Sequence, residues 1–220
     1  MGAPTRDRFA GFSGAYYAIL DCPRWDGRGD ERALLERAER LLAAFPCMLQ
    51  LRAKEASARA LVALARSVLP MARAANVPLC VNDRLDVALA VGADAVHLGQ
   101  DDVPLADARS IAAGRLIIGV STHDPRQAAQ AEAGGADYVG FGPVFGTATK
   151  ANPDPTVGAD QLRRVVEAAR VPIVAIGGVT LDNVAQVVAA GAHAAAVIGA
   201  IEGAADPTAA GRAVAAAFTR

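Results

Sequence analysis

The chain has 220 residues, of which 53% are hydrophobic and only 5% aromatic, and its formal net charge is −1. A chain of this length can bury about 70% of the surface that it exposes when unfolded, so a large core is available. The near-neutral charge gives no electrostatic case for nucleic acid or an anionic membrane as a partner. Any anion-binding site must therefore be formed locally.

Cysteine usage and the first residues favour a reducing compartment. Cys22, Cys47 and Cys80 are far apart and show no CxxC spacing, so the sequence suggests neither a disulfide framework nor a zinc site. The stretch MGAPTRDRFAGFSGAYYAIL has no apolar core long enough for a signal peptide, and no run approaches the ~18 apolar residues of a membrane span. We therefore expect a cytoplasmic protein.

Short apolar β-rich runs alternate with helical stretches along the chain. The expected strands are Ala15–Asp21, Cys47–Arg52, Pro78–Asp83, Ala95–Gly99, Leu116–Ser121, Tyr138–Val144, Pro172–Gly178 and Ala194–Ala200. The expected helices are Asp30–Ala44, Ala58–Asn76, Leu85–Val91, Leu105–Ala112, Pro125–Ala133, Ala159–Ala169, Leu181–Ala190 and Pro207–Phe218. Ser57, Asp124 and Asp206 are the expected N-caps of three helices, and Pro70 is placed to kink or shorten the second helix.

The strict alternation of strands and helices predicts an α/β fold with parallel strands, whose apolar character suits a sheet covered on both faces. Eight repeats in about 220 residues fit a closed (β/α)₈ TIM barrel better than an open Rossmann sheet. A weak internal repeat supports this fold, because Gly92, Gly135 and Gly191 each end a helix and lead through Ala-Asp or Ala-His into a strand. We expect residues 1–220 to form one barrel domain, with its active site at the carboxyl ends of the strands.

Polar residues gather where the expected strands end. Arg52 and Lys54 follow the second strand and could grip a phosphate together, although a solvated pair at the rim has the same spacing. Asp83 and Asp102 close neighbouring strands, and two carboxylates so placed suit a hard cation such as Mg²⁺. The alternative role of each carboxylate is a helix N-cap, and the local sequence does not rank Asp102 above Asp101.

Two further features suggest anion binding. The Gly/Thr/Pro-rich loop after the sixth strand carries Thr147, Thr149 and Lys150, whose hydroxyls and cation could close over an anion. Gly178 and Gly199 end the last two strands, where many barrels bind phosphate through backbone N–H groups. An ordinary polar loop and simple turn glycines are the alternatives.

The histidines give a weaker signal, since the sequence has no metal-binding histidine pair, Ser-His-Asp spacing or P-loop. His97 lies within an expected strand and His193 at a strand entrance, and both placements are typical of structural residues. His123 follows Ser121 at the end of the fifth strand, so it could reach the site.

Taken together, these strand ends resemble the thiamine-phosphate synthase family. The matching motifs recur in the family's order over about residues 47–201 and are Gln50-Leu51-Arg52-Ala53-Lys54, Asn82-Asp83-Arg84, Val96-His97-Leu98-Gly99-Gln100-Asp101-Asp102, Gly119-Val120-Ser121, Gly140–Lys150 and Ala175-Ile176-Gly177-Gly178. The resemblance implies a Mg²⁺-dependent transferase with two small phosphorylated substrates. It would condense hydroxymethylpyrimidine diphosphate with hydroxyethylthiazole phosphate to give thiamine monophosphate and pyrophosphate.

The resemblance also implies residue roles. The pyrimidine diphosphate would bind to Gln50, Leu51, Arg52, Ala53, Lys54, Asn82, Ser121 and Lys150. The thiazole phosphate would bind to Thr147, Ala148, Thr149, Gly178, Ile198 and Gly199. Asp83 and Asp102 would hold Mg²⁺. The family spacing is what selects Asp102 over Asp101. Gly199 stands where the family usually has Ser, and the first strand matches the family only loosely.

In the implied mechanism, the aminopyrimidine can delocalise a carbocation, so pyrophosphate can leave before the thiazole nitrogen attacks. The catalytic residues Arg52, Lys54 and Lys150 would neutralise the charge that grows on pyrophosphate, and no strong general base is needed. One alternative is a thiazole tautomerase-like isomerase of the same barrel family, which would use His123. Another is a non-catalytic phosphate-ligand-binding barrel, which predicts loss of metal and pyrophosphate residues that this chain retains.

Overall fold

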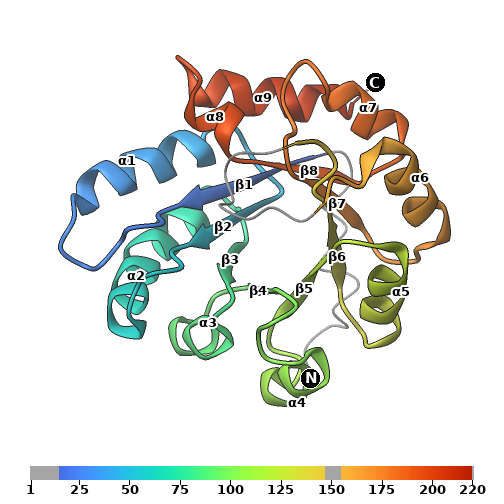
Figure 1. Ribbon diagram of the computed structural model, residues 1–220. Coiled ribbons are helices and arrows are strands. Elements are labelled where there is room, and N and C mark those ends of the chain that lie inside the picture. Colours follow the sequence, from blue (N-terminus) through green and yellow to red (C-terminus); the bar gives the residue numbers. More distant parts are fainter. Residues whose placement is uncertain (1–14, 147–154, 220) are drawn as a thin grey trace.

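The computed structural model describes residues 15–146 and 155–219, and in these residues parallel strands close into a barrel. The strands are β1 (Ala15–Asp21), β2 (Met48–Arg52), β3 (Leu79–Asn82), β4 (Ala95–Leu98), β5 (Ile117–Thr122), β6 (Tyr138–Phe141), β7 (Ile173–Ile176) and β8 (Ala194–Val197). Each strand pairs with its neighbours in the chain, and β8 closes the barrel against β1. The predicted (β/α)₈ barrel is confirmed, and Figure 1 shows its strands in the centre with the helices around them.

The helices of the described residues are α1 (Glu31–Leu42), α2 (Ala58–Ala74), α3 (Leu85–Val91), α4 (Leu105–Ala112), α5 (Pro125–Ala133), α6 (Gly158–Ala168), α7 (Val184–Ala189), α8 (Gly199–Glu202) and α9 (Pro207–Ala217). The predicted caps are confirmed, because the side chains of Ser57, Asp124 and Asp206 accept backbone N–H groups at 3.2, 2.8 and 2.9 Å. Over residues 15–146 and 155–219, every helix falls short of the length and apolar character that crossing a membrane requires.

Two predicted details differ from the structure. Helix α2 continues through Pro70, since its buried face of Leu61, Leu64 and Leu69 offsets the lost backbone hydrogen bond. The predicted strand to Ala200 is wrong, because β8 ends at Val197 and the short helix α8 follows. The apolar run Ala-Val-Ile-Gly-Ala-Ile continues through both elements, and apolar character alone does not separate a buried strand from a buried helix.

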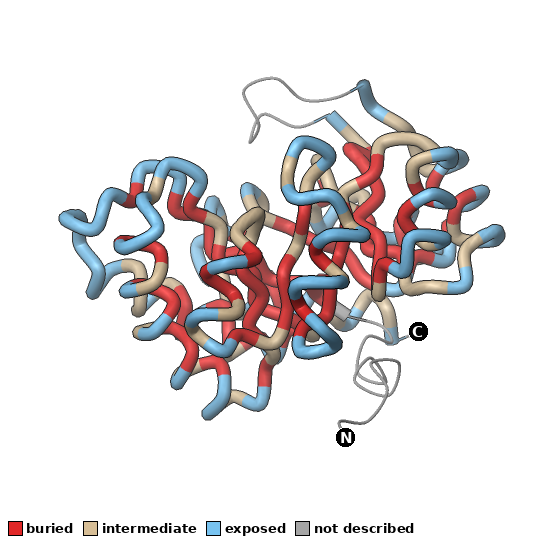
Figure 2. The backbone as a smooth tube through the Cα atoms, turned by 90° about the horizontal axis from the view of Figure 1, so that it is seen from below, coloured by how far each residue is buried: buried red, intermediate tan, exposed pale blue. Residues whose placement is uncertain are grey.

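Alternate strand residues face either the barrel interior or the surrounding helices. The interior cluster consists of Tyr17, Ile19, Met48, Cys80, Ala95, Ile117, Tyr138, Val174, Ala194 and Ala196. The larger cluster between sheet and helices includes Leu49, Leu51, Val81 and Val139. Figure 2 shows this burial along the central backbone, with exposed residues on the outer turns.

The internal repeat has a structural basis at the amino end of the barrel. Gly92, Gly135 and Gly191 have φ values of 71°, 87° and 83°, in the left-handed region that favours glycine. Two residues later, each repeat accepts a hydrogen bond from the preceding strand: Asp94 from Leu79 N at 2.9 Å, Asp137 from Ile118 N at 2.7 Å and His193 from Ile173 N at 3.1 Å. His193 therefore has the structural role that its position predicted.

Candidate active site

The two cations of the second strand end lie beside two carboxylates at the carboxyl end of the barrel. Arg52 Nη1 lies 2.6 Å from Asp21 Oδ1, and the two side chains are only 19% and 8% exposed. Lys54 Nζ lies 3.7 Å from Asp83 Oδ2, and Lys54 is half exposed. Arg52 is thus fixed by a buried carboxylate, whereas Lys54 keeps most of its freedom.

Asp83 and Asp102 lie together at the ends of β3 and β4. Neither caps a helix, because Arg84 is the N-cap of α3 and Pro104 that of α4. Asp102 Oδ2 accepts a hydrogen bond from Gly99 N at 2.6 Å. Burial and the adjacent Asp102 carboxylate raise the pKa of Asp83 to about 6, although Lys54 opposes the shift.

This pair of carboxylates fits a divalent cation. Mg²⁺ commonly takes one or two carboxylates and completes its shell with phosphate and water. The described part of the chain contains no cluster of three or more His, Cys, Asp or Glu that could hold a metal by themselves. Asp101 is exposed on the turn next to Asp102, so it is Asp102 that accompanies Asp83.

A chain of polar side chains crosses the barrel interior beneath these strand ends. Gln50 Nε2 donates to the Tyr17 hydroxyl at 2.9 Å, and this hydroxyl lies 2.9 Å from that of Tyr138. His97 Nδ1 lies 2.9 Å from the Tyr138 hydroxyl, and His97 Nε2 lies 2.8 Å from Ser121 Oγ. The chain joins Gln50 to Ser121, the two predicted pyrimidine ligands at its ends.

Burial sets the protonation states in this chain. It raises the pKa values of Tyr17 and Tyr138 well above the ordinary range of a phenol. It also lowers the pKa of His97 to about 4, although the Asp102 carboxylate opposes the shift. At neutral pH the two phenols are therefore protonated and the imidazole is neutral.

The loops after β7 and β8 bring the predicted phosphate-binding glycines to the same end of the barrel. Gly178 has a φ of 64°, and Asn183 Nδ2 donates to its carbonyl oxygen at 2.9 Å. Asn183 Oδ1 also accepts Thr180 N at 2.8 Å, so one side chain fixes this turn. Ile198 is the N-cap of α8 and Gly199 its first residue, where helical N–H groups have no partner within the helix.

Not every predicted ligand points its side chain into the site. Leu51 and Ala53 belong to the cluster between sheet and helices, so only their backbone can face a ligand. Asn82 ends β3 and pairs in register with His97, which places it at the site. The predicted ligands Thr147, Ala148, Thr149 and Lys150 lie outside the described residues.

His123 lies beside the site but is held by the backbone. The ring Nδ1 lies 2.6 Å from Gly142 O, and the backbone N–H of His123 donates to Gln127 Oε1 at 2.8 Å. Because Gly142 O can only accept, His123 Nδ1 is the donor of this hydrogen bond.

The sequence reasoning missed Asp21, Tyr17 and Tyr138 and assigned His97 to a structural role. Strand alternation could have placed Tyr17 two positions from Ile19 on the interior face. However, the contact between Tyr17 and Tyr138 joins residues 121 positions apart, and it exists only because the barrel closes.

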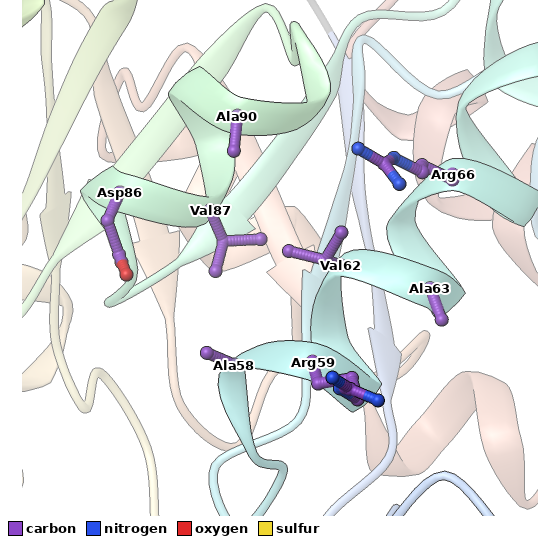
Figure 3. Close-up of a pocket in the computed structure, with 8 residues that line it drawn as sticks. All are labelled: Ala58, Arg59, Val62, Ala63, Arg66, Asp86, Val87 and Ala90. Atoms are coloured by element: carbon purple, nitrogen blue, oxygen red, sulfur yellow. The ribbon is translucent and has the colours of Figure 1, made fainter.

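A separate groove of about 470 Å³ lies on the outside of the barrel between α2 and α3. It is lined by Ala58, Arg59, Val62, Ala63, Arg66, Asp86, Val87 and Ala90 (Figure 3). None of these residues is a predicted ligand or belongs to the strand-end site. The groove is therefore distinct from the candidate active site.

The fold and the site define a (β/α)₈-barrel protein with a polar site at the carboxyl ends of its strands, the position of the active site in barrel enzymes. Residues 17–201 match the family described as thiamine monophosphate synthase. The chain belongs to this family.

Individual relatives agree. The thiamine-phosphate synthase of Roseiflexus castenholzii is 47% identical over 184 residues, which cover 84% of this chain and 81% of that protein. The thiamine-phosphate synthase of Moorella thermoacetica is 43% identical over 205 residues, or 90% of this chain and 98% of that protein.

Solved structures give the same result. Thiamine phosphate pyrophosphorylase from Pyrococcus furiosus matches with a TM-score of 0.82 and 33% identity, covering 97% of this chain and 96% of that one. A 3-hexulose-6-phosphate synthase matches with a TM-score of 0.67 and 24% identity, covering 92% and 99%, which shows a shared fold.

Proposed function

We propose that this chain is a thiamine-phosphate synthase that joins hydroxymethylpyrimidine diphosphate to hydroxyethylthiazole phosphate and releases pyrophosphate. Family membership supports the transferase reaction. One observation supports this site most directly. Arg52 and Lys54 lie beside the carboxylate pair Asp83 and Asp102. Two cations and a paired-carboxylate cation site suit a diphosphate leaving group.

Arg52 and Lys54 bind the diphosphate and stabilise the negative charge that grows as the bond to the pyrimidine methylene breaks. Asp21 holds the Arg52 guanidinium in place, so this cation needs little reorganisation during the reaction. Lys54 supplies a mobile point charge beside Asp83. Lys150, outside the described residues, is proposed as the third cation on the strength of the family motif alone.

Asp83 and Asp102 are the residues that would hold Mg²⁺. When bound there, this ion supplies positive charge to the leaving pyrophosphate. Burial and the adjacent Asp102 carboxylate raise the pKa of Asp83, which supports the assignment, because a cation bound at this pair would stabilise both charged carboxylates.

The thiazole phosphate would bind at the loops after β7 and β8. Gly178, Ile198 and Gly199 offer backbone groups there, and Gly199 can contribute an N–H but no hydroxyl. Thr147, Ala148 and Thr149 are proposed to complete this subsite from the family motif. A thiazole nitrogen held next to the pyrimidine methylene would attack it with a small entropy cost, because the two reactants are already oriented.

The three cysteines are all free thiols, which supports the cytoplasm as the proposed compartment. The partners that we propose are the two small phosphorylated substrates.

The test is formation of thiamine monophosphate by the purified protein, measured after oxidation to its fluorescent thiochrome derivative. Product is expected only when both substrates and Mg²⁺ are present. The tautomerase alternative predicts a different result, namely isomerisation of the thiazole phosphate without any pyrimidine. The non-catalytic alternative predicts binding of a phosphate ligand with no product.

A further inference from the structure

One guanidinium joins the end of strand β1 to the short helix α8. Arg37, on α1, donates from Nη2 to the backbone oxygen of Asp21, the last residue of β1, at 3.0 Å. The same nitrogen donates to Oε1 of Glu202, the last residue of α8. A single side chain of α1 therefore contacts two elements that come from opposite ends of the sequence.

The contact with Asp21 continues into the candidate active site. The Asp21 carboxylate holds Arg52 at 2.6 Å, while the Asp21 backbone oxygen accepts from Arg37. The two strand ends are also joined directly, because Cys22 N donates to Arg52 O at 2.7 Å. Positive and negative side chains thus alternate from the end of β2 to α8, in the order Arg52, Asp21, Arg37 and Glu202.

Helix α8 depends on tertiary contacts for its position. It consists of four residues, and its hydrogen bonds include those from Ile201 N and Glu202 N to Ile198 O, at 3.0 and 2.9 Å. A single helical turn is not stable by itself, because nucleation is unfavourable. Two contacts that hold it are the burial of Ile201 and the ion pair between Glu202 and Arg37.

The charge of Glu202 depends on its partner. Burial raises the pKa of Glu202 and the Asp21 carboxylate adds to the shift, whereas the Arg37 guanidinium opposes it. Arg37 therefore helps to keep this half-buried carboxylate ionised. The side chains of Arg37 and Glu202 are 35% and 36% exposed, so solvent weakens the pair and a moderate effect is expected.

We propose that Arg37 and Glu202 are positioning residues that fix α8 relative to Arg52 and so set the spacing between the two substrate subsites. This inference rests on the proposed function, in which Arg52 binds the diphosphate and the start of α8 binds the thiazole phosphate. Both residues act through α8 and not through contact with a substrate. Without the pair, α8 shifts while Arg52 keeps its bond to the Asp21 carboxylate.

The first experiment is steady-state kinetics of Glu202→Gln, which removes the charge of Glu202 and leaves the bond from Arg37 to Asp21. The KM of the thiazole phosphate should rise about fivefold, the size of one partly exposed ion pair, with an unchanged KM of the pyrimidine diphosphate. The matched control is Glu36→Gln on α1, which removes a more exposed ion pair and should change neither KM. A merely structural role would lower the melting temperature and kcat without this split. Two unchanged KM values in Glu202→Gln overturn the proposal.

A double-mutant cycle tests whether the two residues act as one unit. Arg37→Gln should raise the KM of the thiazole phosphate at least as much as Glu202→Gln does. The double variant should raise it no further than Arg37→Gln alone, because the same contact is already lost. Effects that multiply in the double variant would show two independent roles and overturn the proposal.

Amide hydrogen exchange tests the position of α8 without any substrate. In Arg37→Gln, the amides of Ile201 and Gly203 should exchange about fivefold faster than in wild type, because α8 opens more readily. The amide of Ala210, which donates to Asp206 O at the start of α9, should be unchanged. Unchanged exchange in α8 overturns the proposal, even if the protein forms no thiamine monophosphate. If wild type forms no product while α8 exchanges faster in the variant, the proposed function fails and the link between Arg37 and α8 stands.

Discussion

Gly119 on β5 lies directly opposite Tyr138 on β6, and the ring of Tyr138 occupies the space into which any side chain at Gly119 would project. Tyr138 is fully buried, and its hydroxyl contacts both Tyr17 and His97. This pairing of the smallest residue with a large one inside the barrel links the core to the candidate site.

The substitution Gly119→Ala should therefore destabilise the protein by about 2–3 kcal/mol, because the added methyl group forces the Tyr138 ring to move within a packed interior. Each kcal/mol should lower the melting temperature by about 2–4 °C in a chain of this size. Thermal unfolding measures the effect. The control is Gly146→Ala, since a Cβ at Gly146 would meet nothing within 4 Å. Equal melting temperatures for the two variants would show that the Gly119–Tyr138 packing has been misjudged.

Removing the charge of Asp83 should have opposite effects on stability and activity. In the metal-free protein, the pKa of Asp83 rises from 3.8 to about 6. The folded state then binds the proton more tightly than the unfolded state, so this group lowers the unfolding free energy as pH rises from about 4 to 6. Asp83→Asn should accordingly raise the melting temperature at pH 7.5 without metal.

The same variant should lose the stabilisation that wild type gains from added Mg²⁺ and should reduce turnover by about 10²-fold, the effect of deleting one electrostatic group. Melting curves and kinetics across a Mg²⁺ titration provide both readouts. Asp102→Asn should behave alike, whereas the exposed neighbour Asp101 serves as the control in Asp101→Asn. Full metal-independent activity in both Asp83→Asn and Asp102→Asn would contradict the assignment of these carboxylates to the metal site.

Asp21→Asn should weaken catalysis through Arg52, because the guanidinium loses the carboxylate that holds it at 2.6 Å. We expect kcat to fall by about tenfold, with a smaller change in the KM of the thiazole phosphate. The exposed pair Arg32–Glu36 offers the control Glu36→Gln, which removes an ion pair far more accessible to solvent. Identical kinetics for Asp21→Asn and wild type would mean that Arg52 needs no anchor.

His123→Gln should retain most of the coupling activity, since the departure of pyrophosphate depends little on proton transfer. His123 is placed instead by its bond to the Gly142 carbonyl. Steady-state kinetics with both substrates measure this. A loss near 10³-fold with normal substrate binding would indicate acid–base catalysis of the usual size and would favour the tautomerase alternative.

The sequence predicted the barrel well because its signals are local. Two kinds of signal depend on residues a few positions apart. They are the helix caps at Ser57, Asp124 and Asp206 and the glycines of the internal repeat. The start of α8 was not predictable in this way, because Gly199 lies within an unbroken apolar run.

The candidate site divides along the same line. Arg52, Lys54, Asp83 and Asp102 could be found because each lies at the end of a strand or shortly after it. The Tyr17–Tyr138 contact and the Asp21–Arg52 ion pair depend on which strands become neighbours and in what register. Those long-range relations follow from closure of the barrel, which no local pattern encodes.

The most direct test of the central claim is a single-turnover experiment in which an excess of the protein with bound pyrimidine diphosphate is mixed with thiazole phosphate, with Mg²⁺ or with a chelator. The account predicts thiamine monophosphate and pyrophosphate in equal amounts when Mg²⁺ is present, and neither with the chelator. Pyrophosphate release without thiamine monophosphate, or no product from both substrates in the presence of Mg²⁺, would contradict it.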